Sequence, residues 1–251
     1  MQEQTLTSQT STSLGRSFDV YYRDAKRTKS MDRLNAMFLS EGGLAFDIGA
    51  HVGDRTGSFR RLGASVVSLE PQPQVFRALR LIYGRDDNIT LRCEAVGARP
   101  GSVDLFLNTA NPTISTASSA LISAAQGSPR WVGQNWDGQI QVPMTTLDRL
   151  VDHYGLPDFV KIDVEGFECD VLMGLTCAVP ALSFEFTTIQ PEVTRCCLIR
   201  LKQLGDYEFN YSLGEDHALH HSCWIDADSL GQELTALPHL ANSGDVFARL
   251  R

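Results

Sequence analysis

Short apolar runs alternate along the chain with longer stretches whose apolar positions have helical spacing. The apolar runs predict buried strands at residues 44–48, 65–70, 88–92, 159–163 and 181–186. The helix-spaced stretches predict helices at residues 31–38, 74–83, 165–175 and 191–204. Strands and helices that alternate in this way are typical of βαβ units. The pattern therefore predicts a doubly wound α/β domain with a mostly parallel sheet.

Four alternating segments add strands to this picture. Residues 207–211 and 246–250 predict an antiparallel pair at the end of the domain. Residues 103–107 and 139–142 are expected to pair with each other or to extend the sheet. Residues 108–138 between them are rich in Ser, Thr, Ala, Asn and Gly. Because a connection of this length inside a compact domain is usually functional or mobile, we expect one of these roles for it.

The composition places the domain boundary near the start of the chain. Residues 1–17 are rich in Gln, Ser and Thr and have no apolar period, so they are predicted to form a flexible tail before a single domain at 18–251. Hydrophobic residues make up 43% and charged residues 21%, as in folded globular proteins. No apolar run approaches the ~20 residues of a membrane span, and the first residues do not resemble a signal peptide.

Charge and cysteine usage narrow the class of protein. A formal net charge of −8 argues against a nucleic-acid substrate, because no basic stripe is present to neutralise phosphates. The basic residues within 23–29 are interpreted as a solvated helix face. None of the six cysteines forms a CxxC pair, and Cys196 and Cys197 are adjacent. We interpret all six as reduced thiols of a cytoplasmic protein.

A glycine-containing loop follows the first strand. Asp47 lies near the carboxyl end of that strand, and Gly49 allows a tight turn and a close approach of a ligand to the backbone. Gly53 is expected where the next helix packs on the strand. A dinucleotide fingerprint would require glycine at the position of His51, so a pyrophosphate is disfavoured. The preceding aspartate instead favours a cationic or hydroxyl-bearing ligand, such as a sulfonium nucleoside.

Glu70 supplies the acidic partner of this loop. It ends the second strand about 20 residues downstream, where an acid can accept hydrogen bonds from both ribose hydroxyls. The alternative is a purely structural role, with Asp47 as a capping residue and Glu70 exposed. The two signals together favour a nucleoside site.

Acidic residues also follow two later strands. Asp163 ends a buried strand, Glu165 starts the next predicted helix, and Glu185 ends the neighbouring strand. Such carboxylates could remove a hydroxyl proton or bind a divalent metal. Lys161 lies on the same side of its strand as Asp163 and is a candidate partner for it. Glu165 has an equally good structural role as an acid at a helix N-terminus.

One pair of tryptophans and one pair of histidines give weaker indications of function. Trp131 and Trp136 could stack on a sugar ring, but packing of their own segment is the expected outcome for at least one of them. His220 and His221 are interpreted as a surface turn rather than as a ligand pair.

Four motifs in this order resemble the FkbM family of S-adenosylmethionine-dependent methyltransferases. They are residues 46–53 (FDIGAHVG), 94–97 (EAVG) followed by Gly101, 142–148 (VPMTTLD) and 159–168 (FVKIDVEGFE). The resemblance covers about residues 43–186. It implies a class I, Rossmann-like methyltransferase fold with seven strands, the last of them antiparallel. O-methylation is the usual reaction of the family, on macrolide or sugar hydroxyls that include a fucose of nodulation factors.

The resemblance also implies roles for individual residues. Asp47, Gly49 and Gly53 would shape the methionine end of the cofactor site, Glu70 would hold the ribose, and Glu94 would lie near the adenine. His51 departs from the family, which usually carries asparagine at this position. Its imidazole could contact the cofactor or act as a base near neutral pH.

The sequence thus predicts an S-adenosylmethionine-dependent O-methyltransferase of a sugar, glycolipid or polyketide-type acceptor. Asp163 is the preferred general base, ahead of His51 and Glu165, and the chemistry requires no metal. Two alternatives stay open. One is a nicotinamide-dependent oxidoreductase, which the missing glycine disfavours, and the other is a methyltransferase-like binding module without catalysis.

Overall fold

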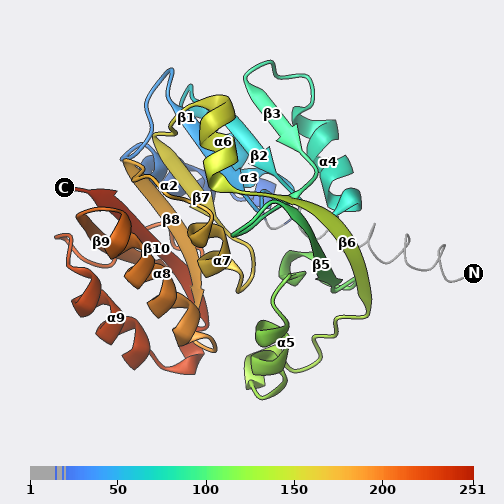
Figure 1. Ribbon diagram of the computed structural model, residues 1–251, viewed down its shortest axis with the longest axis vertical. Helices are drawn as coiled ribbons and strands as arrows, with labels where there is room; N and C mark the ends of the chain where they lie inside the picture. Colours follow the sequence, from blue (N-terminus) through green and yellow to red (C-terminus); the bar gives the residue numbers. More distant parts are fainter. Residues whose placement is uncertain (1–14, 16–18, 20) are drawn as a thin grey trace, which may run out of the picture.

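The computed structural model describes residues 15, 19 and 21–251, so the tail predicted at 1–17 lies almost entirely outside the described residues. A seven-stranded sheet runs through the molecule in the order β3-β2-β1-β7-β8-β10-β9 (Figure 1). Its strands are β1 Leu44–Ile48, β2 Ser65–Leu69, β3 Ile89–Arg92, β7 Phe159–Ile162, β8 Ala181–Thr187, β9 Tyr207–Leu213 and β10 Ser243–Leu250. β10 pairs antiparallel with both β8 and β9, and the other pairs are parallel. The predicted doubly wound α/β fold is confirmed.

Helices cover both faces of this sheet. They are α2 Ala25–Asn35, α3 Asp54–Arg61, α4 Pro73–Tyr83, α6 Leu147–Tyr154, α7 Glu168–Met173, α8 Pro191–Leu204 and α9 Ala227–Ala236. Apolar side chains of α6 to α9 pack on one face, in front of the sheet in Figure 1, and those of α2 and α3 pack on the other. Strands buried on both faces require near-continuous apolar sequences, which explains why short apolar runs predicted the central strands.

Helices α2, α7 and α9 differ from the sequence prediction, and α2 spans Ala25–Asn35 rather than residues 31–38. α7 begins at Glu168 rather than Glu165, because Glu165 and Gly166 have positive φ angles of 55° and 84° and form a turn first. α9 was not predicted. Asp226 caps it by accepting hydrogen bonds from the backbone N–H groups of Asp228 and Ser229, and Leu230 is fully buried beneath it.

A second sheet lies beside the first. It has the order β4-β6-β5, with β4 Ala95–Val96, β5 Gly101–Leu107 and β6 Gly138–Thr145, so the predicted pairing of the last two is confirmed. The segment between β5 and β6 is folded rather than irregular and contains α5 Ser119–Gln126. The rings of Trp131 and Trp136 stack at 6.3 Å, and Trp131 is 9% exposed. Packing, not an open stacking platform, is therefore the role of this pair.

The prediction of six reduced thiols is wrong in the structure. Cys169 of α7 and Cys196 of α8 form a disulfide with Cα atoms 5.9 Å apart, and the other four cysteines are free. The sequence could not show this pairing, because it depends on how the two helices pack on the sheet.

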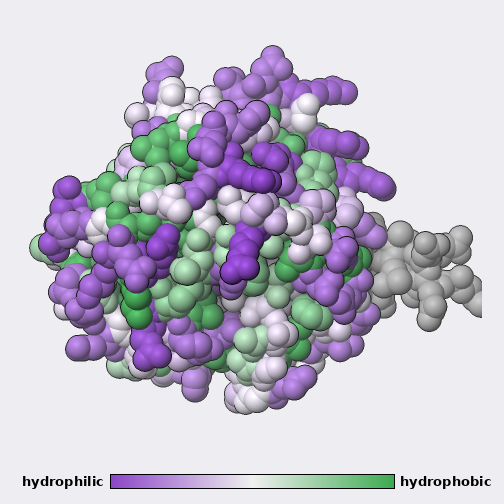
Figure 2. Space-filling model, viewed as in Figure 1, coloured by the Kyte–Doolittle hydropathy of each residue, from purple (hydrophilic) through white to green (hydrophobic). Residues whose placement is uncertain are grey.

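Hydrophobic residues on the face seen in Figure 2 are scattered among hydrophilic ones. Across the described part of the chain, no helix has both the length and the apolar character needed to cross a bilayer.

Candidate active site

A cleft opens where β1, β2 and β7 end. The register places Ile48 opposite both Leu69 and Ile162, so the residues that follow these three strands meet at one edge of the sheet. The residues singled out from the sequence that line the cleft are Asp47, Gly49, His51, Glu70, Glu94, Lys161, Asp163 and Glu165. Parallel strands commonly place ligand sites at this edge.

The glycine loop begins the wall of this cleft. Gly49 has a φ of 82°, and a Cβ atom built on it would lie 1.8 Å from the carbonyl oxygen of Asp163. Only glycine therefore lets the loop after β1 lie against the end of β7. Gly53 lies outside the lining, at the start of α3, where a Cβ atom would meet Leu79 and Tyr83 of α4 at 2.5 Å. Its position is set by helix packing.

Asp47 is buried beneath the loop. Its side chain accepts a hydrogen bond of 2.5 Å from the Thr56 hydroxyl, which is also 2.8 Å from the Ser68 hydroxyl. Burial raises the pKa of Asp47 to about 6, although the hydrogen bond from Thr56 opposes this shift. The carboxyl group thus connects β1 to α3 as well as facing the cleft.

Glu70 is 3% exposed and is fixed by backbone donors. Its two oxygens accept hydrogen bonds from the backbone N–H of Gln72 at 2.8 Å and of His51 at 3.0 Å. Burial raises the pKa of Glu70 to about 7. Each oxygen keeps a lone pair for another donor. Glu94 also lines the cleft and forms an ion pair with Arg92.

His51 is held in the glycine loop with a φ of 48°. Its Nε2 atom is 3.3 Å from the Thr113 hydroxyl, and its ring lies edge-on to Tyr21 with centroids 6.0 Å apart. Burial lowers the pKa of His51, so its imidazole is neutral at pH 7.

Three carboxylates converge beside the loop. An oxygen of each of Asp163, Glu165 and Glu185 lies within 4.8 Å of the others. The Lys161 ammonium group is 3.1 Å from Asp163 and 2.8 Å from Asp245, which confirms the expected Lys161–Asp163 contact. Burial, together with repulsion by neighbouring carboxylates, raises the pKa of Glu165 and of Glu185. Lys161 is the cation in contact with this cluster and does not balance the charge of all three carboxylates.

Glu168 and Asp245, two acidic residues beside the carboxylate cluster, were not assigned a role from the sequence. Glu168 is 2% exposed, and its carboxylate accepts hydrogen bonds from the backbone N–H groups of Val164 and Gly166, which fixes the turn that carries Glu165. Asp245 lies opposite Glu185 in the β8–β10 register. Asp245 precedes the strand predicted at 246–250, and only the strand order shows that it lies beside Glu185.

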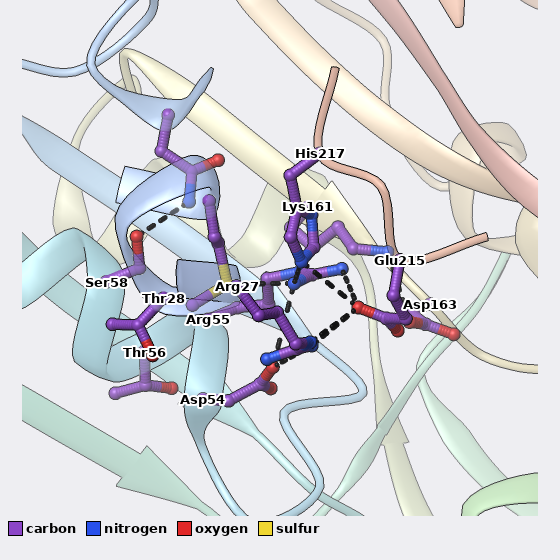
Figure 3. A network of polar contacts seen from close by, with 12 residues as sticks. Arg27, Thr28, Asp54, Arg55, Thr56, Ser58, Lys161, Asp163, Glu215 and His217 are labelled. Carbon is purple, nitrogen blue, oxygen red and sulfur yellow. Dashed lines mark hydrogen bonds and ion pairs between the residues drawn. The ribbon is translucent and has the colours of Figure 1, made fainter. Parts of the chain in front are cut away.

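A network of charged residues closes the rim of the cleft (Figure 3). Arg27 contacts Asp54 at 2.8 Å and Glu215 at 2.5 Å, and Arg55 lies 3.6 Å from Glu215 and 3.5 Å from Asp245. Although burial opposes the shift, His217 and the two arginines hold the pKa of Glu215 below its usual range. The Arg27 side chain is 9% exposed, so it does not belong to the solvated face that the sequence predicted.

The sheet order, the single antiparallel strand and the acid-lined cleft define a class I methyltransferase. The methyltransferase FkbM domain model matches residues 47–221, and the chain belongs to this family. Its cofactor is S-adenosylmethionine. No curated protein matches the chain.

The chain is similar to several solved methyltransferase structures at low sequence identity. A precorrin-6y C5,15-methyltransferase from Geobacter metallireducens is 12% identical, with a TM-score of 0.46 and coverage of 92% of this chain and 91% of the other. A TehB-like methyltransferase from Corynebacterium glutamicum is 9% identical, with a TM-score of 0.47 and 94% coverage of each chain. An O-methyltransferase from Bacillus cereus in complex with SAH is 11% identical, with a TM-score of 0.44 and coverage of 99% and 91%.

Proposed function

We propose that this methyltransferase transfers a methyl group to a hydroxyl oxygen of a sugar, glycolipid or polyketide-type acceptor. The observation that carries the proposal is the carboxylate cluster of Asp163, Glu165 and Glu185, immediately beside the Gly49 turn. A hydroxyl must lose its proton when its oxygen is methylated, and a carboxylate at this position is suited to accept that proton.

The residues that line the cleft fit S-adenosylmethionine. Glu70 offers two fixed carboxylate oxygens for the ribose hydroxyls, and Gly49 leaves the loop backbone accessible. The apolar residues Leu69, Val96 and Leu105 also line the cleft and suit an adenine ring, with Glu94 nearby. When bound, the cofactor supplies a methyl group on a positively charged sulfur.

Asp163 is the proposed general base. Its side chain is 38% exposed, whereas Glu165 is buried and 8% exposed. An acceptor hydroxyl can therefore reach Asp163 most readily, and Lys161 holds its carboxylate in place. His51 is the alternative base on the cofactor side, with its neutral ring facing Thr113.

Membership of the family favours methyl transfer over the reaction of a nicotinamide-dependent oxidoreductase. Measured turnover distinguishes an active enzyme from a binding module without catalysis. The test is incubation of the enzyme with S-adenosylmethionine carrying a labelled methyl group and a panel of glycans, glycolipids and polyketides. We expect label on an acceptor oxygen, detected by mass spectrometry, and none with Asp163→Asn. Label on nitrogen or carbon, or S-adenosylhomocysteine binding without transfer to any acceptor, would contradict the proposal.

The cytoplasmic location expected from the sequence stays a prediction. A disulfide is more typical of an oxidising compartment. Rapid alkylation of the thiols in the cell, followed by a count of alkylated cysteines by mass spectrometry, tests it: six alkylated cysteines agree with a reducing compartment, and four agree with the Cys169–Cys196 disulfide.

A further inference from the structure

A second group of metal-ligating side chains lies between the segment after β9 and helix α9. His220 and His221 belong to that segment, and Glu233 belongs to α9, which packs beside α8 (Figure 1). One ligand atom from each residue lies within 4.8 Å of the others. None of the three is among the described residues that line the cleft, so the group is separate from the proposed active site.

The distances suit a small transition-metal ion. The Nε2 atoms of His221 and His220 lie 2.9 Å and 3.5 Å from the two carboxylate oxygens of Glu233. With metal–ligand bonds of about 2.0–2.1 Å, two ligand atoms of a tetrahedral zinc site are separated by about 3.3 Å. Because the observed separations lie on either side of this value, small side-chain movements would accommodate an ion.

Buried parts of β9 fix the histidine backbone. The Asn210 side chain, in a residue that is 1% exposed, donates a hydrogen bond to the His221 carbonyl at 2.8 Å and accepts one from the His221 N–H at 3.0 Å. The His220 N–H donates to the Tyr211 carbonyl at 2.7 Å. These contacts hold both imidazoles towards α9 before any ligand binds.

The carboxylate is oriented as well. The Tyr211 hydroxyl donates a 2.8 Å hydrogen bond to one oxygen of Glu233, and the Tyr211 ring stacks on His220 with centroids 4.5 Å apart. Hydrogen bonds of this kind commonly orient the ligands of metal sites. The His220 side chain is 48% exposed and that of Glu233 is 33% exposed, so water can reach a fourth coordination position.

We propose that His220, His221 and Glu233 bind one zinc-like divalent ion, with water as a further ligand. Two imidazoles and one carboxylate favour zinc over magnesium or calcium, which prefer oxygen ligands. Such an ion would fix the far end of the segment that begins with Gly214 and carries Glu215 at the rim of the cleft.

The test uses the tag-free, full-length protein after treatment with a chelator. Titration with ZnCl₂ by calorimetry is expected to show one ion per chain, and Co²⁺ is expected to give the visible absorption of a tetrahedral site. His221→Ala and Glu233→Gln should each lower zinc affinity at least tenfold. The His221 substitution leaves the backbone contacts to Asn210 available, so it is expected to keep the fold, which circular dichroism checks.

Two matched variants act as controls. His239→Ala removes a histidine outside the group, and Cys223→Ser removes an exposed thiol two residues after His221 in the sequence. Neither should change the affinity. Absence of saturable binding, unchanged affinity in both folded ligand variants, or loss of binding in Cys223→Ser alone would overturn the proposal.

Discussion

The two sides of the cleft surround their acidic residues with different partners. On the β1–β2 side, Asp47 and Glu70 are each satisfied by uncharged donors from the hydroxyl of Thr56 or from the backbone. On the β7–β8 side, Asp163, Glu165 and Glu185 crowd together near one lysine. Fixed neutral donors suit binding of a ligand, whereas a crowded and partly uncompensated cluster suits proton transfer. The comparison assigns cofactor binding to the first side and acceptor chemistry to the second.

The largest effect is expected at the β7–β8 side. Asp163→Asn should lower kcat at least a hundredfold, about 2.7 kcal/mol, because the amide cannot accept the acceptor proton. Affinity for S-adenosylhomocysteine, measured by calorimetry, should change less than threefold. Asp170→Asn on the exposed surface of α7 is the matched control and should retain normal turnover. Equal losses of turnover and cofactor affinity in Asp163→Asn would contradict the assignment of separate roles to the two sides of the cleft.

The buried acid Glu168 tests how the β7–β8 turn is held. Its pKa of about 7 in the folded protein exceeds the ordinary 4.5, so between these values the folded state binds more protons than the unfolded chain. Its contribution to stability is therefore complete below pH 4.5 and is lost as the pH rises through about 7.

Glu168→Gln should flatten this decrease by about 2 kcal/mol, since glutamine has an oxygen for the same backbone donors but does not ionise. Urea unfolding between pH 5 and pH 8 measures it. Glu192→Gln, at an exposed position of α8, should follow the wild-type curve. An identical pH dependence in Glu168→Gln and wild type would show that this group does not titrate as described.

On the β1–β2 side the expected effect is on binding. Glu70→Ala should weaken S-adenosylhomocysteine binding at least tenfold, about 1.4 kcal/mol, because the ribose hydroxyls lose their acceptor. Glu70→Gln, which preserves shape, should have a smaller effect in the same direction. Calorimetry on folded variants gives both values, and wild-type affinity in Glu70→Ala would exclude this residue from the cofactor site.

The smallest effect is expected at the rim. Arg27→Ala removes contacts to Asp54 and Glu215 and should raise the acceptor KM about threefold, because the rim of the cleft loses a nearly buried cation. Cofactor affinity should not change. Arg23→Ala serves as the control, since the Arg23 side chain is 78% exposed. If Arg27→Ala altered cofactor affinity instead, the rim would belong to the other side of the cleft.

The same contrast explains how much the sequence revealed. The cofactor side is encoded locally: a strand, a glycine turn and an acid at the end of the next strand identify Gly49 and Glu70 without knowledge of the fold. Lys161 and Asp163 were paired because strand alternation is also local. Asp245, Arg27 and Glu215 come from elements far apart in the chain, and only the position of β10 beside β8 and the packing of α2 and of the segment after β9 bring them together.

The Cys169–Cys196 disulfide and the folded segment 108–138 were missed for a related reason. The first depends on the contact between α7 and α8, and the second is stabilised by packing of Trp131 and its neighbours rather than by a strong helical pattern.

The most direct test is a crystal structure of the enzyme with S-adenosylhomocysteine. We predict the ribose hydroxyls on the Glu70 carboxylate, the Gly49 turn against the amino-acid portion, and the sulfur facing Asp163. S-adenosylhomocysteine bound elsewhere, with Tyr21 and His51 filling the cleft, would contradict the account.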